Sequence, residues 1–159
     1  MELGKKLFSF TITGDLDPAE FVRMGRATRY RNARKKLVLI LPLVFLAFVM
    51  SLAVSPIIGM IVVIAGIQLL VYLEYSARVM ANNIKNKLPI DYEFYENGLV
   101  ETIGNQSEEI SYSRFVQVKM NKHLFVFVGK KDDKIVLVPR SLLQEDDEIQ
   151  LMKLKRMIG

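Results

Sequence analysis

An uncharged, apolar stretch from Leu37 to Leu73 limits what this chain can fold into more than any other feature. A transmembrane helix takes ~20 apolar residues, so the stretch is long enough for two crossings. Ser55-Pro56 divides it, because proline lacks an N–H and disfavours a helical conformation at the residue before it. A buried hairpin in a soluble core is the alternative, but 159 residues cannot cover two helices that are apolar all round. We therefore predict a transmembrane hairpin with spans of about 37–54 and 57–75.

Positive charge is concentrated beside this hairpin. Residues 1–88 contain 12 Lys/Arg and 5 Asp/Glu, whereas residues 89–159 contain 10 and 12. Because positively charged flanks stay in the cytoplasm, we predict a multi-pass protein of the plasma membrane with both termini cytoplasmic. Nucleic-acid binding would place the positive excess on the folded domain, so no nucleic-acid partner is expected.

Several cations lie in the segment that leads into the first span. Anionic lipid headgroups are attracted to such juxtamembrane charges, at ~1 kcal/mol each. A topology signal without headgroup binding is the alternative, and the sequence favours it. The candidate headgroup contacts are Arg29, Arg34, Lys35 and Lys36.

Short β-segments occur on both sides of the hairpin. Alternating apolar residues predict a strand over 5–13, and turn signals separate six further strands between Tyr92 and Val138. Residues 141–157 predict a helix with acids in its first turn and cations in its last. The pattern predicts an α+β membrane protein, with the two-helix hairpin inserted into a seven-stranded, pleckstrin-homology-like (PH-like) β-barrel or sandwich that carries one C-terminal helix.

This fold divides the chain into three parts. Residues 1–14 form a strand that joins the later sheet, residues 15–88 form the helical stalk and the hairpin, and residues 89–159 form a cytosolic PH-like domain. The bilayer is the first expected partner of such a protein.

The C-terminal part resembles the YcxB-like family of bacterial membrane proteins. Four segments carry the resemblance: YEFYENGL at 92–99, ISYS at 110–113, LFVFV at 124–128 and VLVPR at 136–140. The resemblance implies two spans ahead of a PH-like domain in a bacterial inner membrane, and it implies no particular activity.

Residue types that carry chemistry are sparse. The chain has no cysteine and a single histidine, His123, whereas a zinc site needs three or four converging ligands. It contains no GxSxG nucleophile elbow and no GxxxxGK[ST] phosphate loop. We therefore predict no catalytic, cofactor or metal site, and no enzyme activity.

Two strands are apolar on both faces, residues 124–128 and 135–138. A sheet with one face in water should alternate instead. Either the core covers one face and the C-terminal helix or stalk covers the other, or one face is a partner groove. The sequence favours the first interpretation. The candidate partner surface of the second consists of Phe125, Phe127 and Arg140.

The favoured function is a membrane-anchored, non-catalytic interaction or regulatory module. Its PH-like domain would bind a protein partner, or a second copy of the chain, at the cytosolic face. One alternative is recognition of anionic lipid, and another is an oligomeric membrane protein for a small solute. Gln68 is the one amide within the predicted spans, and it is either an interhelical contact or a functional group.

Overall fold

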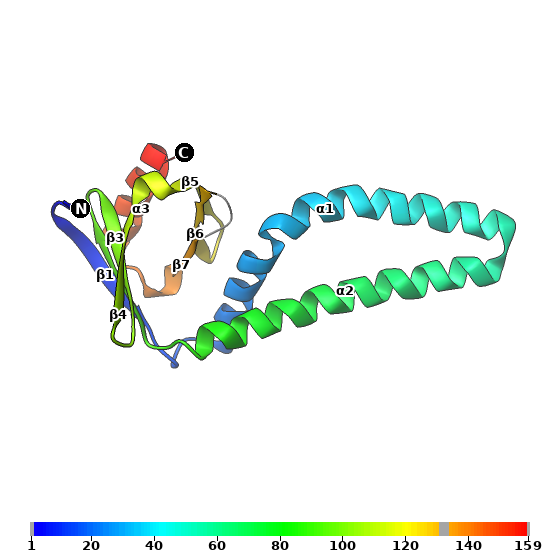
Figure 1. Ribbon diagram of the computed structural model, residues 1–159, viewed down its shortest axis with the longest axis horizontal. Helices are drawn as coiled ribbons and strands as arrows, with labels where there is room; N and C mark the ends of the chain where they lie inside the picture. Colours follow the sequence, from blue (N-terminus) through cyan, green and yellow to red (C-terminus); the bar gives the residue numbers. More distant parts are fainter. Residues whose placement is uncertain (1, 131–133, 159) are drawn as a thin grey trace.

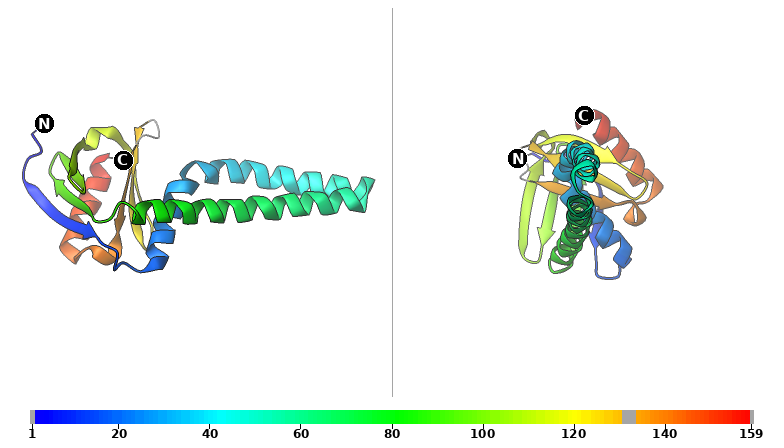
Figure 2. Two further views of the ribbon diagram at one scale, coloured as in Figure 1. Left: turned by 60° about the horizontal axis from the view of Figure 1, so that its bottom comes forward. Right: turned by 90° about the vertical axis from the view of Figure 1, so that its right-hand side faces the viewer.

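The computed structural model describes residues 2–130 and 134–158, without the side chains of residues 29–41, 43 and 52–54. Two long helices form an antiparallel pair that projects from a small β domain (Figure 1). Both termini lie at the β domain, far from the turn between the helices. Figure 2 shows, in its right-hand view along the pair, that the sheets and the C-terminal helix surround its base.

The first helix is α1 (Pro18–Val54). The Asp17 side chain caps it by accepting a hydrogen bond from the Ala19 amide at 2.9 Å, and Pro18 occupies its first turn. Ser55 separates α1 from α2 (Pro56–Lys85) in an extended conformation, as expected for the residue before proline. The two helices therefore form a hairpin with a one-residue connection.

Within the described part of the chain, α2 is the one helix long and apolar enough to cross a membrane. Many side chains of the first predicted span, 37–54, lie outside the described residues. The structure thus shows one candidate span where the sequence predicts two. Large apolar side chains are exposed on both helices, for example Phe45 at 68 % and Ile57 at 70 %.

Seven described strands form two antiparallel sheets. The first sheet has the order β1-β2-β3-β4 and the second the order β5-β6-β7. The strands are β1 (Lys6–Ile12), β2 (Ile90–Tyr95), β3 (Gly98–Ile103), β4 (Gln106–Ser111), β5 (Phe115–Met120), β6 (Leu124–Gly129) and β7 (Ile135–Pro139). β1 pairs with β2, from Ile12 opposite Ile90 to Lys6 opposite Tyr95, although the whole helical hairpin separates them in sequence.

The sequence predicts either a barrel or a sandwich. The described strands form two separate sheets and therefore a sandwich, not a closed barrel. A single turn of 3-10 helix, η1 (Tyr112–Arg114), takes the chain from β4 to β5, and no described strand pair joins the sheets. The Tyr112 hydroxyl donates to the Tyr95 carbonyl at 2.8 Å, which holds this corner against β2. The α+β class and the strand count agree with the sequence.

Aromatic side chains join the two sheets at the centre of the domain. Phe94 of β2 stacks on Phe8 at a centroid distance of 4.7 Å and meets Phe127 of β6 at 5.7 Å. Phe115 contacts the edge of Phe127 at 5.4 Å. Such ring pairs add about 0.5–1.5 kcal/mol each beyond their burial, so this cluster holds the sandwich together.

The C-terminal helix α3 (Glu145–Ile158) closes the side of the sandwich near β5 and β1. Leu151 and Leu154 of α3 are buried, and four acids occupy its first turn, where they complement the helix dipole. A short 3-10 turn, η3 (Arg140–Leu142), leads into it from β7. The remaining open side of the sandwich faces the base of the hairpin.

Candidate functional site: a cleft between the stalk and the sheets

The part of the helical pair next to the β domain, which we call the stalk, is packed into the core of that domain. It consists of the N-terminal part of α1 and the C-terminal part of α2. Phe21 and Met24 of α1 and Ala81 of α2 belong to the same buried cluster as the two sheets. The N-terminal part of α1 also contacts β7 and lies at an angle to the rest of the helix (Figures 1 and 2). The domain therefore sits on the stalk through a shared core.

Gly25 makes the close approach of the two stalk helices possible. A Cβ atom at this position would overlap the carbonyl oxygen of Ala77 and would lie 2.9 Å from the amide nitrogen of Ala81. Because both neighbours are backbone atoms, they cannot move aside as a flexible side chain would. Arg26, the next residue of α1, donates two hydrogen bonds to Glu74 of α2, at 3.2 and 2.7 Å, and joins the helices at the end of the apolar stretch.

A cleft of about 670 Å³ lies between this stalk and the open side of the sandwich. Its lining is more apolar than polar. The stalk residues that line it are Met24, Thr28, Met80, Asn83, Ile84, Asn86 and Lys87. The domain residues are Ile12, Ile90, Tyr92, Glu101, Ile103, Lys134, Ile135 and Leu137. Its volume lies in the range of small-molecule sites, ~300–1,000 Å³.

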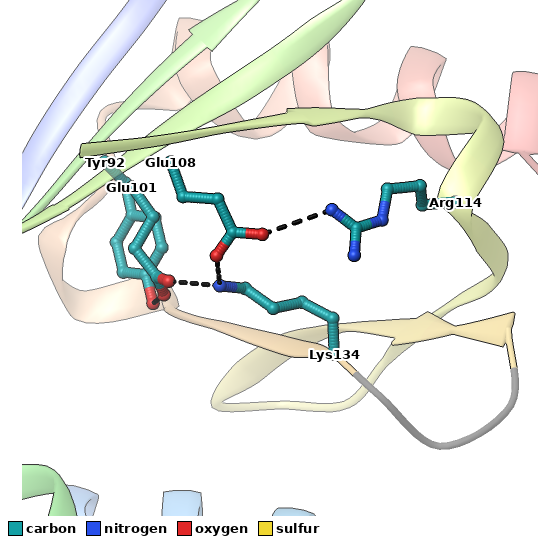
Figure 3. Close-up of polar contacts among 5 residues, drawn as sticks. All are labelled: Tyr92, Glu101, Glu108, Arg114 and Lys134. Carbon is teal, nitrogen blue, oxygen red and sulfur yellow. Dashed lines mark hydrogen bonds and ion pairs between the residues drawn. The ribbon is translucent and has the colours of Figure 1, made fainter. Parts of the chain in front are cut away.

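Five polar side chains form a connected group beside the cleft, which we call the polar clamp: Tyr92, Glu101, Glu108, Arg114 and Lys134 (Figure 3). The Lys134 ammonium donates to Glu101 at 2.5 Å and to Glu108 at 2.7 Å. Tyr92 donates its hydroxyl to the other oxygen of Glu101 at 2.6 Å, and Arg114 donates to Glu108 at 3.1 Å. Lys134 precedes β7 while its partners lie on β3 and β4, so the clamp joins two sheets that share no strand pair.

The surroundings of the clamp shift the pKa values of three of its members. Burial, together with the charge and hydrogen bond of Glu101, raises the pKa of the Tyr92 hydroxyl well above its usual value. Burial lowers the pKa of Lys134, but the two carboxylates raise it by more, so the net shift is upward. The hydrogen bond from Lys134 lowers the pKa of Glu108 despite its partial burial. At neutral pH Tyr92 is therefore neutral, while Lys134 and Glu108 are charged.

This arrangement suits binding better than acid–base chemistry. A catalytic acid or base needs a pKa near the working pH, whereas these shifts move all three groups away from neutrality. Each charge in the clamp also faces an opposite charge at hydrogen-bond distance. Among the described residues, no group of three or more metal-ligating side chains converges. The clamp therefore links the two sheets beside a cleft whose lining is more apolar than polar.

The structure buries Phe125 and Phe127, two of the three residues of the candidate partner surface. Both rings are 0 % exposed, and Phe127 packs against Phe94 of the other sheet. Arg140 forms two hydrogen bonds with Glu148 of α3 and lies over the Phe125 ring, 5.8 Å from its centroid. Leu137 of the opposite face lines the cleft beside the stalk. The interpretation that both faces are covered within the chain is the one that fits.

The predicted headgroup contacts fall on undescribed side chains. Arg29, Arg34, Lys35 and Lys36 all lie within α1, but their side chains are outside the described part of the structure. Headgroup binding by these residues stays a prediction. His123, the single histidine of the chain, is half-buried immediately before β6, and its carbonyl accepts a hydrogen bond from the Arg140 amide at 2.9 Å.

Sequence reasoning missed the cleft and the clamp. One signal was present: Glu101 alternates with Leu99 and Ile103 along β3, so it occupies the inward face of a strand. A charged residue on an inward face is rarely buried without a partner, and this pattern marks Glu101 as paired. Its main partner, Lys134, lies 33 positions later in the chain, so no local pattern connects the two.

Comparison with known proteins supports the resemblance seen in the sequence. No curated protein and no solved structure matches the chain. Residues 94–155, which run from β2 into α3, match the model of a family described as YcxB-like protein. The resemblance to the YcxB-like family is therefore confirmed over this part of the chain.

Proposed function

We propose that this protein is a membrane-anchored, non-catalytic binding module. Its hairpin crosses the plasma membrane twice and leaves both termini in the cytoplasm, where the two-sheet domain stands on the stalk. The cleft between stalk and sheets is the binding site. The observation that carries the proposal is that the anchor and the domain each supply about half of the residues that line one apolar cleft.

A two-span anchor is supported by both helices. The stretch from Leu37 to Val54 contains no charged residue, and α1 runs beside α2 along its length (Figure 1). Ser51 of α1 and Gly59 of α2 are both buried, which places small residues where the helices meet. A helix of 18 residues is about 27 Å long, close to the ~30 Å of a hydrocarbon core. The exposed apolar side chains of both helices would then face lipid.

The chemistry of the cleft favours a single-chain, anionic amphiphile as its ligand. Its walls are lined mainly by isoleucine, leucine and methionine, which suit a flexible aliphatic chain. Glu101 and Lys134 neutralise each other, so Lys87 contributes the remaining charge among the described lining residues. Asn83 and Asn86 lie beside Lys87 on the stalk and can donate hydrogen bonds to a carboxylate or phosphate.

Photocrosslinking in native membranes tests this function. A fatty acid that carries a diazirine on its chain is added to membranes with the full-length protein, and labelled peptides are mapped by mass spectrometry. We expect labels on the stalk and strand residues of the cleft, for example Ile84 and Ile103. Ile103→Trp should fill the cleft and remove those labels, whereas Val116→Trp, on an exposed part of β5, should keep them.

The distribution of the labels separates cleft binding from contact with the bilayer. Labels confined to residues 37–75, and unchanged by Ile103→Trp, would mean that the probe only meets the anchor from the lipid. That result would contradict the cleft as a lipid-binding site. A protein partner of the domain would then be the favoured ligand. Release of the chain by carbonate washing would contradict the anchor itself.

A further inference from the structure

One exposed face of α2 carries a regular seam that the hairpin itself does not use. Its six positions are spaced alternately by four and three residues, which is the heptad pattern of two helices in a left-handed coiled coil. The seam consists of Ile57, Ile61, Ile64, Gln68, Val71 and Tyr75. All six side chains are exposed, and the five large apolar ones are 52–70 % exposed.

The seam lies on the side of α2 away from α1. The buried residues of α2 include Gly59 and Leu73, and Gly66 approaches Val44 of α1. Gly59 and Leu73 are each two positions from a seam residue, Ile57 and Tyr75, which is about 200° around a helix of 3.6 residues per turn. Packing within the hairpin therefore leaves the seam free along the apolar part of α2.

Gln68 lies in the middle of the seam, and its amide determines which kind of partner the seam can bind. Between Ile57 and Val71 it is the one side chain that can donate and accept hydrogen bonds. Its side chain is exposed and forms no hydrogen bond with another described residue of the chain. In a bilayer this amide would face hydrocarbon, where an unpaired polar group is costly.

We propose that two copies of this chain associate in the membrane through the α2 seam, with the Gln68 side chains hydrogen-bonded to each other. Copies with the same topology present the seam in parallel and at the same depth, so a two-fold axis brings each Gln68 opposite its equivalent. A carboxamide is both donor and acceptor and therefore pairs with itself. A polar residue at one seam position sets the register and orientation of the paired helices.

The proposal takes α2 as a membrane span, as the proposed function does, and adds a second copy as its occupant. Because the chain contains no cysteine, single-cysteine variants need no prior replacement. In native membranes, Ile61→Cys, Ile64→Cys and Val71→Cys should form oxidative dimers. Val63→Cys and Leu70→Cys are the matched controls, because these side chains are 42 % and 56 % exposed but lie about 130° from the seam. The proposal would be overturned if the control variants crosslink as efficiently as the seam variants.

Gln68 is tested separately in the full-length protein reconstituted in bilayers of defined lipid content. Gln68→Leu should weaken dimerisation about three- to tenfold, the range of measured hydrogen bonds between membrane helices, and Gln68→Asn should restore much of it. A monomer at all protein-to-lipid ratios would overturn the proposal, and so would a dimer that Gln68→Leu leaves unchanged. A chain that resists carbonate washing but shows no seam crosslinks would overturn the seam and leave the anchor intact.

Discussion

Replacing Lys134 by methionine is the sharpest test of how the two sheets are held together. Methionine keeps much of the length and apolar character of the lysine stem but removes the ammonium that meets Glu101 and Glu108. The side chains of Glu101 and Lys134 are 11 % and 19 % exposed, so the pair is largely shielded from water. After Lys134→Met, Glu101 keeps the hydroxyl of Tyr92 as a donor but faces no opposite charge.

The expected loss of stability follows from this burial. Removing one partner of a buried ion pair costs ~3–5 kcal/mol, mainly because it leaves the other charge unpaired. Tyr92 still satisfies one oxygen of Glu101, so we expect the lower end, about 3 kcal/mol. Glu108 adds nothing to this figure, because its side chain is 48 % exposed and remains hydrated without Lys134.

Pulse proteolysis of the full-length protein in detergent, over a range of urea concentrations, measures the stability of the β domain. Lys122→Met is the matched control, since Lys122 is an exposed lysine of the same domain. The double variant Glu101→Gln, Lys134→Met should recover part of the loss, because an amide in place of the carboxylate leaves no buried charge unpaired. If Lys134→Met and Lys122→Met differ by less than roughly 0.5 kcal/mol, the clamp does not hold the sheets together.

Three further predictions concern the stalk, the core and the pH dependence. Gly25→Ala should destabilise the protein by ~1–3 kcal/mol through overpacking, whereas Gly14→Ala, with open space around it, should change little when both are followed by thermal unfolding. Phe127→Asp should prevent folding of the domain, and Val116→Asp should leave it folded by circular dichroism. Because the pKa of Tyr92 is raised, the stability it contributes is complete below pH ~10 and declines as the pH rises further, and Tyr92→Phe should remove that part of the decline in urea titrations.

Local signals in the sequence were sufficient for most of the secondary structure. Asp17-Pro18 predicts the start of α1, and Ser55-Pro56 predicts the division between the two helices, since each acts through the conformation of its own neighbours. The strands and the C-terminal helix follow from residue alternation and from turn residues in the same way. Gly104-Asn105, for instance, forms the two-residue turn between β3 and β4, with Gly104 at a φ of +59°.

The site could not be predicted because its parts meet only in three dimensions. The walls of the cleft come from both stalk helices and from strands of both sheets, and no local pattern indicates how these elements pack. The same limit explains the partner surface predicted at Phe125 and Phe127. Continuous apolar character shows that both faces of β6 are covered, but it does not say whether the cover belongs to the same chain.

The position of β1 has a consequence for how the protein is made. β1 leaves the ribosome before α1 and α2, and its neighbour β2 follows only after both helices have been synthesised. Until then Phe8 has no Phe94 on which to stack, and the exposed backbone edge of β1 is a risk for aggregation. Completion of the first sheet is therefore delayed until the helical hairpin has been translated, so a chain that stalls within the hairpin cannot assemble this sheet.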